Sequence, residues 1–214
     1  MKKMILVLAT GNPGKKRELM AMLEGFPVEI RNLSDFGPIP EIKEDGATFD
    51  DNAYKKASLT ARYLGFAAMA DDSGLEVAAL DGAPGVHSAR YAGDNASDGA
   101  NNEKLLAAME GVENRKAAFK CVISIAVPTG QALTYEGSCE GDILREPRGD
   151  KGFGYDPLFF CPELQKTFGE ADLEEKGRVS HRGRALTEVR REFDKILVWL
   201  EQNMPRLEKF DCVR

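Results

Sequence analysis

Residues 4–15 read MILVLATGNPGK, a short apolar run that changes abruptly into a glycine-containing turn. Six apolar residues in a row at its start are typical of a strand that is buried on both faces of a sheet. The turn leads into residues 15–24, where apolar side chains recur at helical spacing until Gly25 ends the pattern. A buried strand, a tight turn and a helix in this order predict an α/β fold.

The rest of the chain repeats strand and helix patterns. Strands are expected at residues 28–32, 66–70, 117–127 and 132–143, the last two forming a hairpin around the turn at 128–130. A loop is expected at 34–46, and helices are expected from Asp50 to Leu64, after Asp98, and from Ser180 to Leu200, with Asp50, Asp98 and Ser180 as candidate N-caps.

Composition narrows the class of protein. A chain of 214 residues with 43% hydrophobic and 30% charged residues fits one globular domain. The net charge of -6 argues against binding to nucleic acid, which is held mainly by clustered Lys and Arg. Because no stretch reaches the roughly 18 apolar residues that span a bilayer, we expect no membrane contact and a cytoplasmic location.

The cysteines give no sign of a zinc site. Cys121, Cys139, Cys161 and Cys212 show no C-x-x-C spacing, and the chain has only two histidines. Two of the cysteines fall in expected strands. Buried free thiols are therefore the expected state.

The turn at residues 10–15 has the composition of a phosphate-binding site. It lies between a strand and a helix, where unpaired backbone N–H groups and the helix dipole attract anions. Thr10 and Asn12 add neutral hydrogen-bonding groups. Gly11 allows a tight turn, and Lys15 adds positive charge. The turn lacks the Gly and Ser or Thr of a Walker A motif, and an ordinary strand-to-helix turn is the alternative.

Asp71 and Asp72 are the most informative acidic residues. They follow the apolar run at 66–70, so we expect them at the carboxyl end of a strand, where open α/β sheets bind ligands. Consecutive residues of an extended chain point to opposite faces, so only one carboxylate is expected to face a cleft. Carboxylates suit Mg²⁺, and Glu44 can supply another oxygen. The alternative is an Asx turn in solvent.

Polar groups on two expected helices and one turn extend the candidate site. Asn52 and Lys56 are four residues apart and share a helix face, for which a solvated surface is the alternative. The turn at 153–157 carries aromatic rings that can stack on a nucleobase or simply pack. Residues 180–182 read SHR, with Lys176 upstream; cationic groups at a helix N-terminus are unfavourable unless an anion or polar ligand compensates them.

Six motifs in order resemble those of the inosine/xanthosine triphosphate pyrophosphatase (ITPase) family. They are TGNxxK at 10–15, NAxxKA at 52–57, ADDSG at 70–74, GAPGxxSARY at 82–91, GFGYDP at 152–157 and SHR at 180–182. The resemblance extends from about residue 4 to about residue 200. It implies a mixed, elongated central sheet flanked by helices, with two lobes and a cleft between them. One domain over residues 1–202 and a C-terminal tail at 203–214 follow from it.

The resemblance also implies an activity and an assembly. The expected reaction is hydrolysis of deaminated purine nucleotides, namely ITP, dITP and XTP, to the monophosphate and pyrophosphate by a Mg²⁺-dependent homodimer. Catalysis is assigned to Asp72 and Lys56, and metal binding to Asp72 and Glu44. The substrate-binding residues are expected to be Thr10, Gly11, Asn12, Lys15, Ser73, Phe153, Gly154, Tyr155, Asp156, Lys176, His181 and Arg182.

Base preference follows from donors and acceptors. The donor-only guanidinium of Arg182 can satisfy the oxygen of a 6-keto purine but not the 6-amino group of adenine. Leaving such groups unpaired costs about 1–3 kcal/mol, and exclusion of GTP does not follow because guanine is also a 6-keto purine. Three alternatives stay open: a Maf-like pyrophosphatase of other modified nucleotides, a nucleotide-binding regulator without turnover, and a structural protein.

Overall fold

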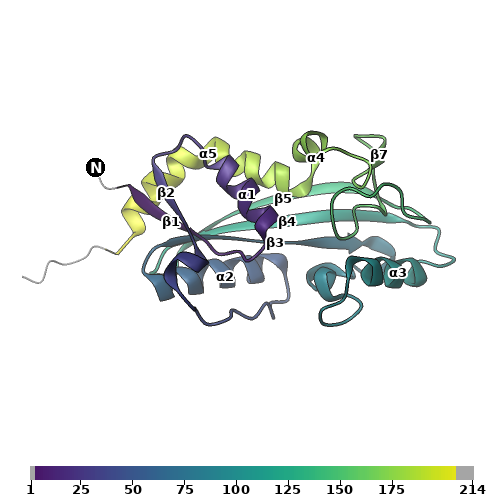
Figure 1. Ribbon diagram of the computed structural model, residues 1–214, viewed down its shortest axis with the longest axis horizontal. Coiled ribbons are helices and arrows are strands. Elements are labelled where there is room, and N and C mark those ends of the chain that lie inside the picture. The colour runs from purple at the N-terminus through teal and green to yellow at the C-terminus, as the bar shows by residue number, and fades with distance from the viewer. Residues whose placement is uncertain (1–2, 206–214) are drawn as a thin grey trace, which may run out of the picture.

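The computed structural model describes residues 3–205, which form a seven-stranded sheet with helices on both faces (Figure 1). The strands are β1 (Met4–Leu8), β2 (Val28–Asn32), β3 (Ala67–Val77), β4 (Lys116–Ala126), β5 (Ala132–Ile143), β6 (Phe159–Cys161) and β7 (Lys166–Thr167). Their order is β2-β1-β3-β4-β5-β6-β7. β1 is parallel to β2 and β3, and the pairs from β3 to β7 are antiparallel. The predicted α/β fold with a mixed sheet is confirmed.

Helices cover both faces of this sheet. They are α1 (Pro13–Met22), α2 (Phe49–Leu64), α3 (Asp98–Ala108), α4 (Leu173–Val179) and α5 (His181–Asn203), with short 3-10 helices η1 (Leu33–Phe36), η2 (Ala78–Leu80) and η3 (Gly85–Arg90). Figure 1 shows α1, α4 and α5 on one side and α2 and α3 on the other. The long strands β3, β4 and β5 are shared by two lobes, one containing β1, β2 and α2 and the other α3, α4, β6 and β7.

β3 has two different neighbours along its length. It pairs in parallel with β1 only over Ala67–Met69, whereas it pairs with β4 from Ala68 to Val77. Beyond Met69, the edge of β3 on the β1 side has no further named strand beside it in the described part of the chain, and a single bridge joins Glu76 to Pro84. From Ala70 onward, β3 therefore has a free edge on the side where β1 has ended, although β3 is an inner strand of the sheet.

This arrangement corrects the expected position of the two aspartates. The strand expected at 66–70 extends to Val77, so the prediction that Asp71 and Asp72 follow a strand end is wrong. They lie inside β3, because β4 continues to provide hydrogen-bond partners after β1 has ended. It is the carboxyl end of β1, not of β3, that opens the sheet beside them.

Side-chain caps set the starts of the helices. Thr48 accepts a hydrogen bond at the start of α2, Ser97 at the start of α3 and Ser180 at the start of α5. The cap predicted at Ser180 is confirmed. The caps predicted at Asp50 and Asp98 are wrong, because both residues lie in the first helical turn. A carboxylate there interacts favourably with the helix dipole but is not the N-cap.

The start of α5 lies directly against the sheet. A Cβ at Gly137 of β5 would overlap the backbone oxygen of His181 and would lie 2.7 Å from the backbone nitrogen of Ala185. Only glycine allows this approach. Farther along α5, the expected apolar stripe packs on the sheet, with Val189, Phe193, Ile196 and Leu200 buried and Leu186 and Leu197 partly buried. The packing fixes His181 and its neighbours over the middle of the sheet.

Three cysteines match the expectation of buried free thiols. Cys121, Cys139 and Cys161 are buried and unpaired, and burial raises the pKa of Cys121 to about 11. Cys212 and residues 206–214 of the tail predicted at 203–214 lie outside the described residues. Among residues 3–205, no helix has both the length and the apolar character needed to cross a lipid bilayer.

Candidate active site

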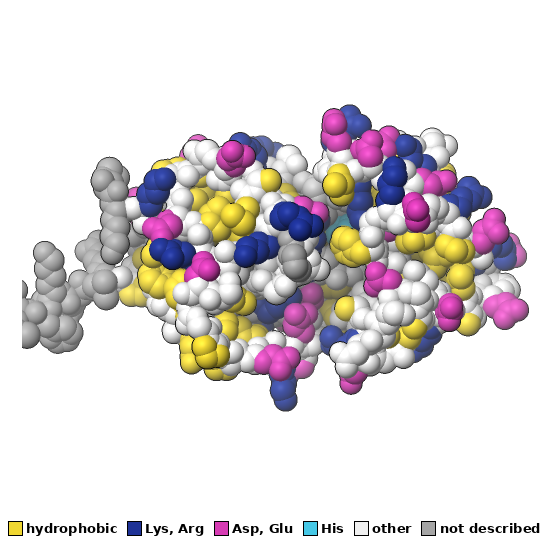
Figure 2. Space-filling view, viewed as in Figure 1, with side chains coloured by type: hydrophobic (Ala, Val, Ile, Leu, Met, Phe, Trp, Pro, Cys, Tyr) yellow, Lys and Arg dark blue, Asp and Glu magenta, His cyan; other side chains and the backbone are white. Residues whose placement is uncertain are grey.

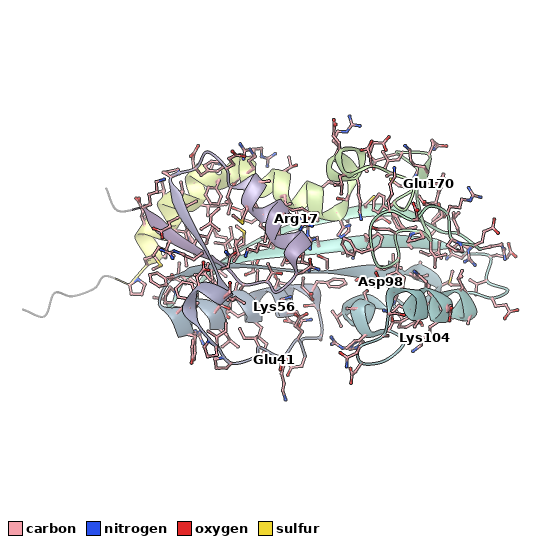
Figure 3. The ribbon with its side chains drawn as sticks, viewed as in Figure 1. Arg17, Glu41, Lys56, Asp98, Lys104 and Glu170 are labelled. Carbon is pink, nitrogen blue, oxygen red and sulfur yellow. The ribbon has the colours of Figure 1, made fainter. Side chains whose placement is uncertain are left out.

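A cleft of about 700 Å³ opens at the free edge of β3. Figure 2 shows a furrow between the two lobes in this region. Every side chain that the sequence predicted for the site lines the cleft: Thr10, Gly11, Asn12, Lys15, Glu44, Lys56, Asp72, Ser73, Phe153, Gly154, Tyr155, Asp156, Lys176, His181 and Arg182. The walls also bring Lys56 on α2 and Asp98 at the start of α3 to opposite sides of the gap (Figure 3).

The turn between β1 and α1 is held by its own polar side chains. The Asn12 side chain accepts hydrogen bonds from the backbone N–H groups of Gly14 (2.8 Å) and Lys15 (3.2 Å). The Thr10 hydroxyl accepts one from the Asn12 N–H (3.2 Å). Three of the N–H groups expected to attract phosphate are therefore bonded within the turn itself. The charge of Lys15, which pairs with Asp71, and the dipole of α1 are the features of the turn that favour an anion.

Asp71 is a buried anion that joins the starts of α1 and α5. Its Oδ2 lies 2.8 Å from Lys15 Nζ and also accepts a hydrogen bond from Arg182. Burial alone would favour the neutral carboxyl, but the charges of Lys15 and Arg182 outweigh it and hold the pKa of Asp71 well below its usual value. Asp71 is therefore ionised and supports two residues of the cleft.

Asp72 points to the opposite face of β3, toward α2. Its Oδ2 accepts a hydrogen bond from Asn52 Nδ2 (3.1 Å), and its Oδ1 lies 3.5 Å from Lys56 Nζ. Lys56 Nζ also lies 3.1 Å from Glu44 Oε1. Burial raises the pKa of Asp72, and Lys56 and Asn52 offset this only in part. Asp71 is not among the cleft-lining residues and Asp72 is, in agreement with the expectation that one of the pair faces the cleft.

The carboxylates of Asp72 and Glu44 fit the way Mg²⁺ binds beside phosphates. Both approach the same Lys56 ammonium, so they come from different elements to one place in the cleft. Within residues 3–205, no group of three or more His, Cys, Asp or Glu side chains is arranged to hold a metal by itself. Two carboxylates that depend on substrate oxygens to complete the coordination are a common Mg²⁺ arrangement.

The turn at the other end of the cleft presents an aromatic ring to solvent. Phe153 is 57% exposed, and Lys176 Nζ lies 4.7 Å from its ring centroid. Asp156 is buried, forms an ion pair with Lys176 and accepts a hydrogen bond from the Phe153 N–H (2.9 Å). Tyr155 is instead buried in the core, and its hydroxyl donates to the carbonyl of Ser88 (2.8 Å).

Helix α3 holds the backbone of this aromatic turn. The Asp98 carboxylate accepts a hydrogen bond from the Gly154 N–H (2.6 Å), and Asn102 Nδ2 donates to the Gly154 carbonyl (2.9 Å). Gly154 has a φ of +59°, a conformation that favours glycine. The position of Phe153 is therefore set from both sides, by α3 and by Lys176.

His181 and Arg182 begin α5 in different electrostatic states. The His181 ring stacks on Phe119 with centroids 4.8 Å apart, and burial together with the charges of Arg182 and Lys176 keeps its pKa well below the usual value. His181 is therefore neutral. Arg182 is charged and paired with Asp71 and, at 3.3 Å, with Glu18. These anions compensate the cation at the helix start that the sequence alone left unexplained.

Several residues of the site had no assigned role in the sequence-based prediction. Asp71, Glu18, Asn52, Asp98 and Asn102 each contact a predicted site residue. Asn52 had a signal, since it shares a helix face with Lys56. Asp71 had one as well, as the neighbour of Asp72 in the ADDSG motif, whereas Glu18, Asp98 and Asn102 act through partners far away in the sequence, which leaves no local pattern.

The fold and the cleft define a class of protein. A basic and acidic cleft of this size at the carboxyl end of a parallel strand is typical of an α/β protein that binds phosphorylated small molecules. The chain belongs to the Ham1 family, whose model matches residues 6–192. This membership confirms the resemblance that the six motifs carry.

Known proteins of the family resemble the chain over nearly its whole length. The chain is 68% identical over 200 residues to a dITP/XTP pyrophosphatase from Syntrophobacter fumaroxidans. The aligned region covers 94% of this chain and 86% of that protein. A dITP/XTP pyrophosphatase from Desulfotalea psychrophila is 59% identical, with 94% and 90% covered. The structure of a HAM1 protein from Coxiella burnetii matches with a TM-score of 0.86 and 42% identity over 90% of this chain and 99% of that one.

Proposed function

We propose that this protein is a nucleoside triphosphate pyrophosphohydrolase that converts dITP, ITP and XTP to the monophosphate and pyrophosphate and so removes deaminated purines from the nucleotide pool. The observation that carries the proposal is the position of Asp72, a buried carboxylate beside Lys56 at the free edge of β3, in a cleft that also contains Lys15 and Phe153. The relatives of this chain that are named dITP/XTP pyrophosphatase support the substrate class.

Asp72 is the group that handles the attacking water. Its Oδ2 is engaged by Asn52, so Oδ1 is the oxygen that can orient the water and accept its proton. Because burial raises the pKa of Asp72, this carboxylate is a better proton acceptor than an exposed aspartate. Attack on the α-phosphorus in line with the leaving group then releases pyrophosphate.

Asp72 and Glu44 would hold Mg²⁺, which when bound supplies positive charge to the phosphate oxygens and lowers the pKa of a bound water. Lys56 lies between these two carboxylates and is placed to transfer its contact to a phosphate oxygen when substrate enters. Lys15 adds a second cation at the α1 end of the cleft. The two ammonium groups stabilise negative charge that grows on the leaving pyrophosphate.

The opposite end of the cleft suits a 6-keto purine. The exposed ring of Phe153 offers a stacking surface. Lys176 and Arg182, which only donate, and one N–H of the neutral His181 also line the cleft and match a keto oxygen, and the two donor-only groups oppose an amino group. Because Arg182 is already paired with Asp71 and Glu18, its orientation is fixed before the base arrives.

The working form in this proposal is a cytoplasmic homodimer. The net charge of -6 and the absence of a bilayer-length apolar run support a protein that acts on small soluble nucleotides instead of nucleic acid or membranes. Sedimentation equilibrium tests the dimer, with a mass near twice that of the chain expected and a monomer contradicting it.

One assay tests the activity and its rivals together. Purified protein is incubated with Mg²⁺ and, separately, ITP, dITP, XTP, GTP, ATP and pyrimidine triphosphates, and release of pyrophosphate is compared with release of phosphate. Pyrophosphate from ITP, dITP and XTP, lost on addition of EDTA and restored by excess Mg²⁺, is expected. Binding without turnover would instead identify a regulator, turnover of other modified nucleotides only would identify a Maf-like enzyme, and preference for ATP would overturn the base argument.

A further inference from the structure

Asn52 is a buried side chain of α2 that contacts the Asp72 carboxylate and the backbone of the loop that carries Glu44. It is 1% exposed. Its Nδ2 donates to Asp72 Oδ2 at 3.1 Å, and its Oδ1 accepts from the backbone N–H of Gly46 at 2.8 Å. Because one end of the amide only donates and the other only accepts, these two partners fix its orientation.

Lys56 makes the same connection one helical turn later. Its Nζ lies 3.5 Å from Asp72 Oδ1 and 3.1 Å from Glu44 Oε1. Residues four apart on a helix are neighbours on its surface. Asn52 and Lys56 therefore each join β3 to the loop that carries Glu44, and they do so at different oxygens of the Asp72 carboxylate. Contacts at both oxygens fix the rotation of that carboxylate.

The loop before α2 is pressed against the helix at this point. A Cβ at Gly46 would lie 2.6 Å from Asp51 Cβ and 2.8 Å from Asn52 Oδ1, so the backbone is in close contact with α2. On the other side, Arg90 of η3 donates to the Glu44 carbonyl at 2.9 Å. The Glu44 loop is therefore held by Lys56, by Arg90 and by the Asn52 amide, and only the amide holds the loop backbone and the Asp72 carboxylate at once.

We propose that Asn52 is a positioning residue for the reaction. Its donor end turns the Asp72 carboxylate so that Oδ1 faces Lys56 and the cleft, and its acceptor end holds the Glu44 loop at a fixed distance from Asp72. This role for Asn52 rests on the proposed function, since it concerns the same reaction. The geometry requires an amide, because a carboxylate at this position would repel Asp72 and a hydrocarbon would release both partners.

Two substitutions separate the two ends of the amide. Asn52→Asp keeps an acceptor for the Gly46 N–H and replaces the donor with an anion, whereas Asn52→Ala removes both. With ITP and saturating Mg²⁺, both variants are expected to lose at least about tenfold in kcat with KM changed by less than about threefold. Hydrogen exchange of the amides in residues 37–48, followed by mass spectrometry, is expected to increase in Asn52→Ala and to stay near wild type in Asn52→Asp.

Thr48→Ala is the matched control, since it removes the N-cap of the same helix without touching Asp72. It is expected to lower Tm and to leave kcat within about twofold of wild type. Equal loss of kcat in Thr48→Ala and Asn52→Ala, or kcat of Asn52→Asp within about threefold of wild type, overturns the proposal. If Asn52→Asp does not fold, Asn52→Ala decides by the same two measurements. A wild type inert toward all triphosphates contradicts the proposed function, and unchanged exchange in Asn52→Ala then separately contradicts the loop tie.

Discussion

Asp71 and Arg182 form an ion pair that is buried between β3 and the first turn of α5, with the two residues only 2% and 7% exposed. The pair connects a strand residue that does not line the cleft to a helix residue that does. Lys15 shares the same carboxylate oxygen. One anion on the hidden face of the sheet thus orders two cations of the site.

Asp71→Asn is expected to destabilise the protein strongly. Removing one partner of a buried pair leaves uncompensated charge, which costs about 3–5 kcal/mol. The pKa of Asp71 is depressed by Lys15 and Arg182, so its contribution to stability is present above the unfolded pKa of about 3.9 and is lost as pH falls below it. Urea denaturation should therefore show a large difference at pH 7 that shrinks below about pH 4.

Glu188→Gln is the control for this prediction. Glu188 forms an exposed pair with Arg191 on α5, where solvent screens the charges. Its free energy of unfolding should stay close to that of the wild type. A loss in Asp71→Asn no larger than that in Glu188→Gln would show that the buried pair does not stabilise the packing of α5 on β3.

Asp72→Asn is expected to abolish turnover without loss of stability. Losing a general base costs at least about 10²-fold in kcat. Since burial raises the pKa of Asp72, its contribution to stability is complete below the unfolded pKa and is lost as pH rises through the folded one. The ionised side chain is thus a net cost at pH 7, and Tm of the variant should equal or exceed that of the wild type. Pyrophosphate release and thermal melting check the two parts, and near-normal kcat would remove Asp72 from the chemistry.

His181 predicts a fall in stability on mild acidification. Its pKa is lowered by burial and by the charges of Arg182 and Lys176, so the folded state binds the proton less well than the unfolded state. Stability is complete above the unfolded pKa of about 6.5 and declines as pH falls below it. Denaturation curves between pH 8 and 5.5 should show this decline in the wild type and a flatter dependence in His181→Asn. Parallel curves would mean that His181 does not titrate differently on folding.

Gly74→Ala is expected to force β3 and η3 apart. The new Cβ would lie 2.5 Å from Ser88 Oγ and 2.6 Å from the Gly85 carbonyl. Such overpacking costs about 1–3 kcal/mol and moves the wall next to Asp72, so both Tm and kcat should fall. Gly99→Ala in α3 is the control, because its Cβ would meet only Ser97 Oγ at 3.8 Å. A Tm for Gly74→Ala equal to that of the control would contradict the predicted clash.

Phe153→Ala separates binding of the base from the chemistry. Stacking on an aromatic ring contributes about 1–3 kcal/mol per base, so KM for ITP should rise about tenfold or more. Because Phe153 is largely exposed, Tm should change little. Steady-state kinetics of Phe153→Ala and of the conservative Phe153→Tyr check this, with Phe153→Tyr close to wild type. Equal KM values for all three proteins would exclude stacking on this ring.

The sequence was sufficient where the determining interactions are local. The apolar run of β1, the turn after it and the stripe along α5 each have a local signal in the sequence, and all three are found, although α1 begins at Pro13 and not at residue 15. Strand alternation also separated Asp71 from Asp72. The motifs then identified the residues that line one cleft, although they come from distant parts of the chain.

The sequence was insufficient where the structure depends on interactions between residues that are distant in the chain. The apolar run of β3 stops at Ala70, because Asp71 supports Lys15 and Arg182 and the next residues line the cleft, while β4 continues to pair with the strand to Val77. Helix α4 has no buried residue, and its Leu173 is 85% exposed, so it offers no apolar stripe to recognise. The partners of Arg182 lie on α1 and β3, and no sequence pattern near residue 182 predicts them.

The five residues of β1 beside the eleven of β3 leave a step in the sheet. The cleft occupies the volume that a longer β1 would fill. The short length of β1 therefore creates the space in which substrate can bind. Lengthening β1 by a few residues would extend the strand into the cleft and displace the turn at residues 10–15 that lines it. The floor of the cleft, in contrast, is built on a continuous β3–β4 pair that extends from Ala68 to Val77.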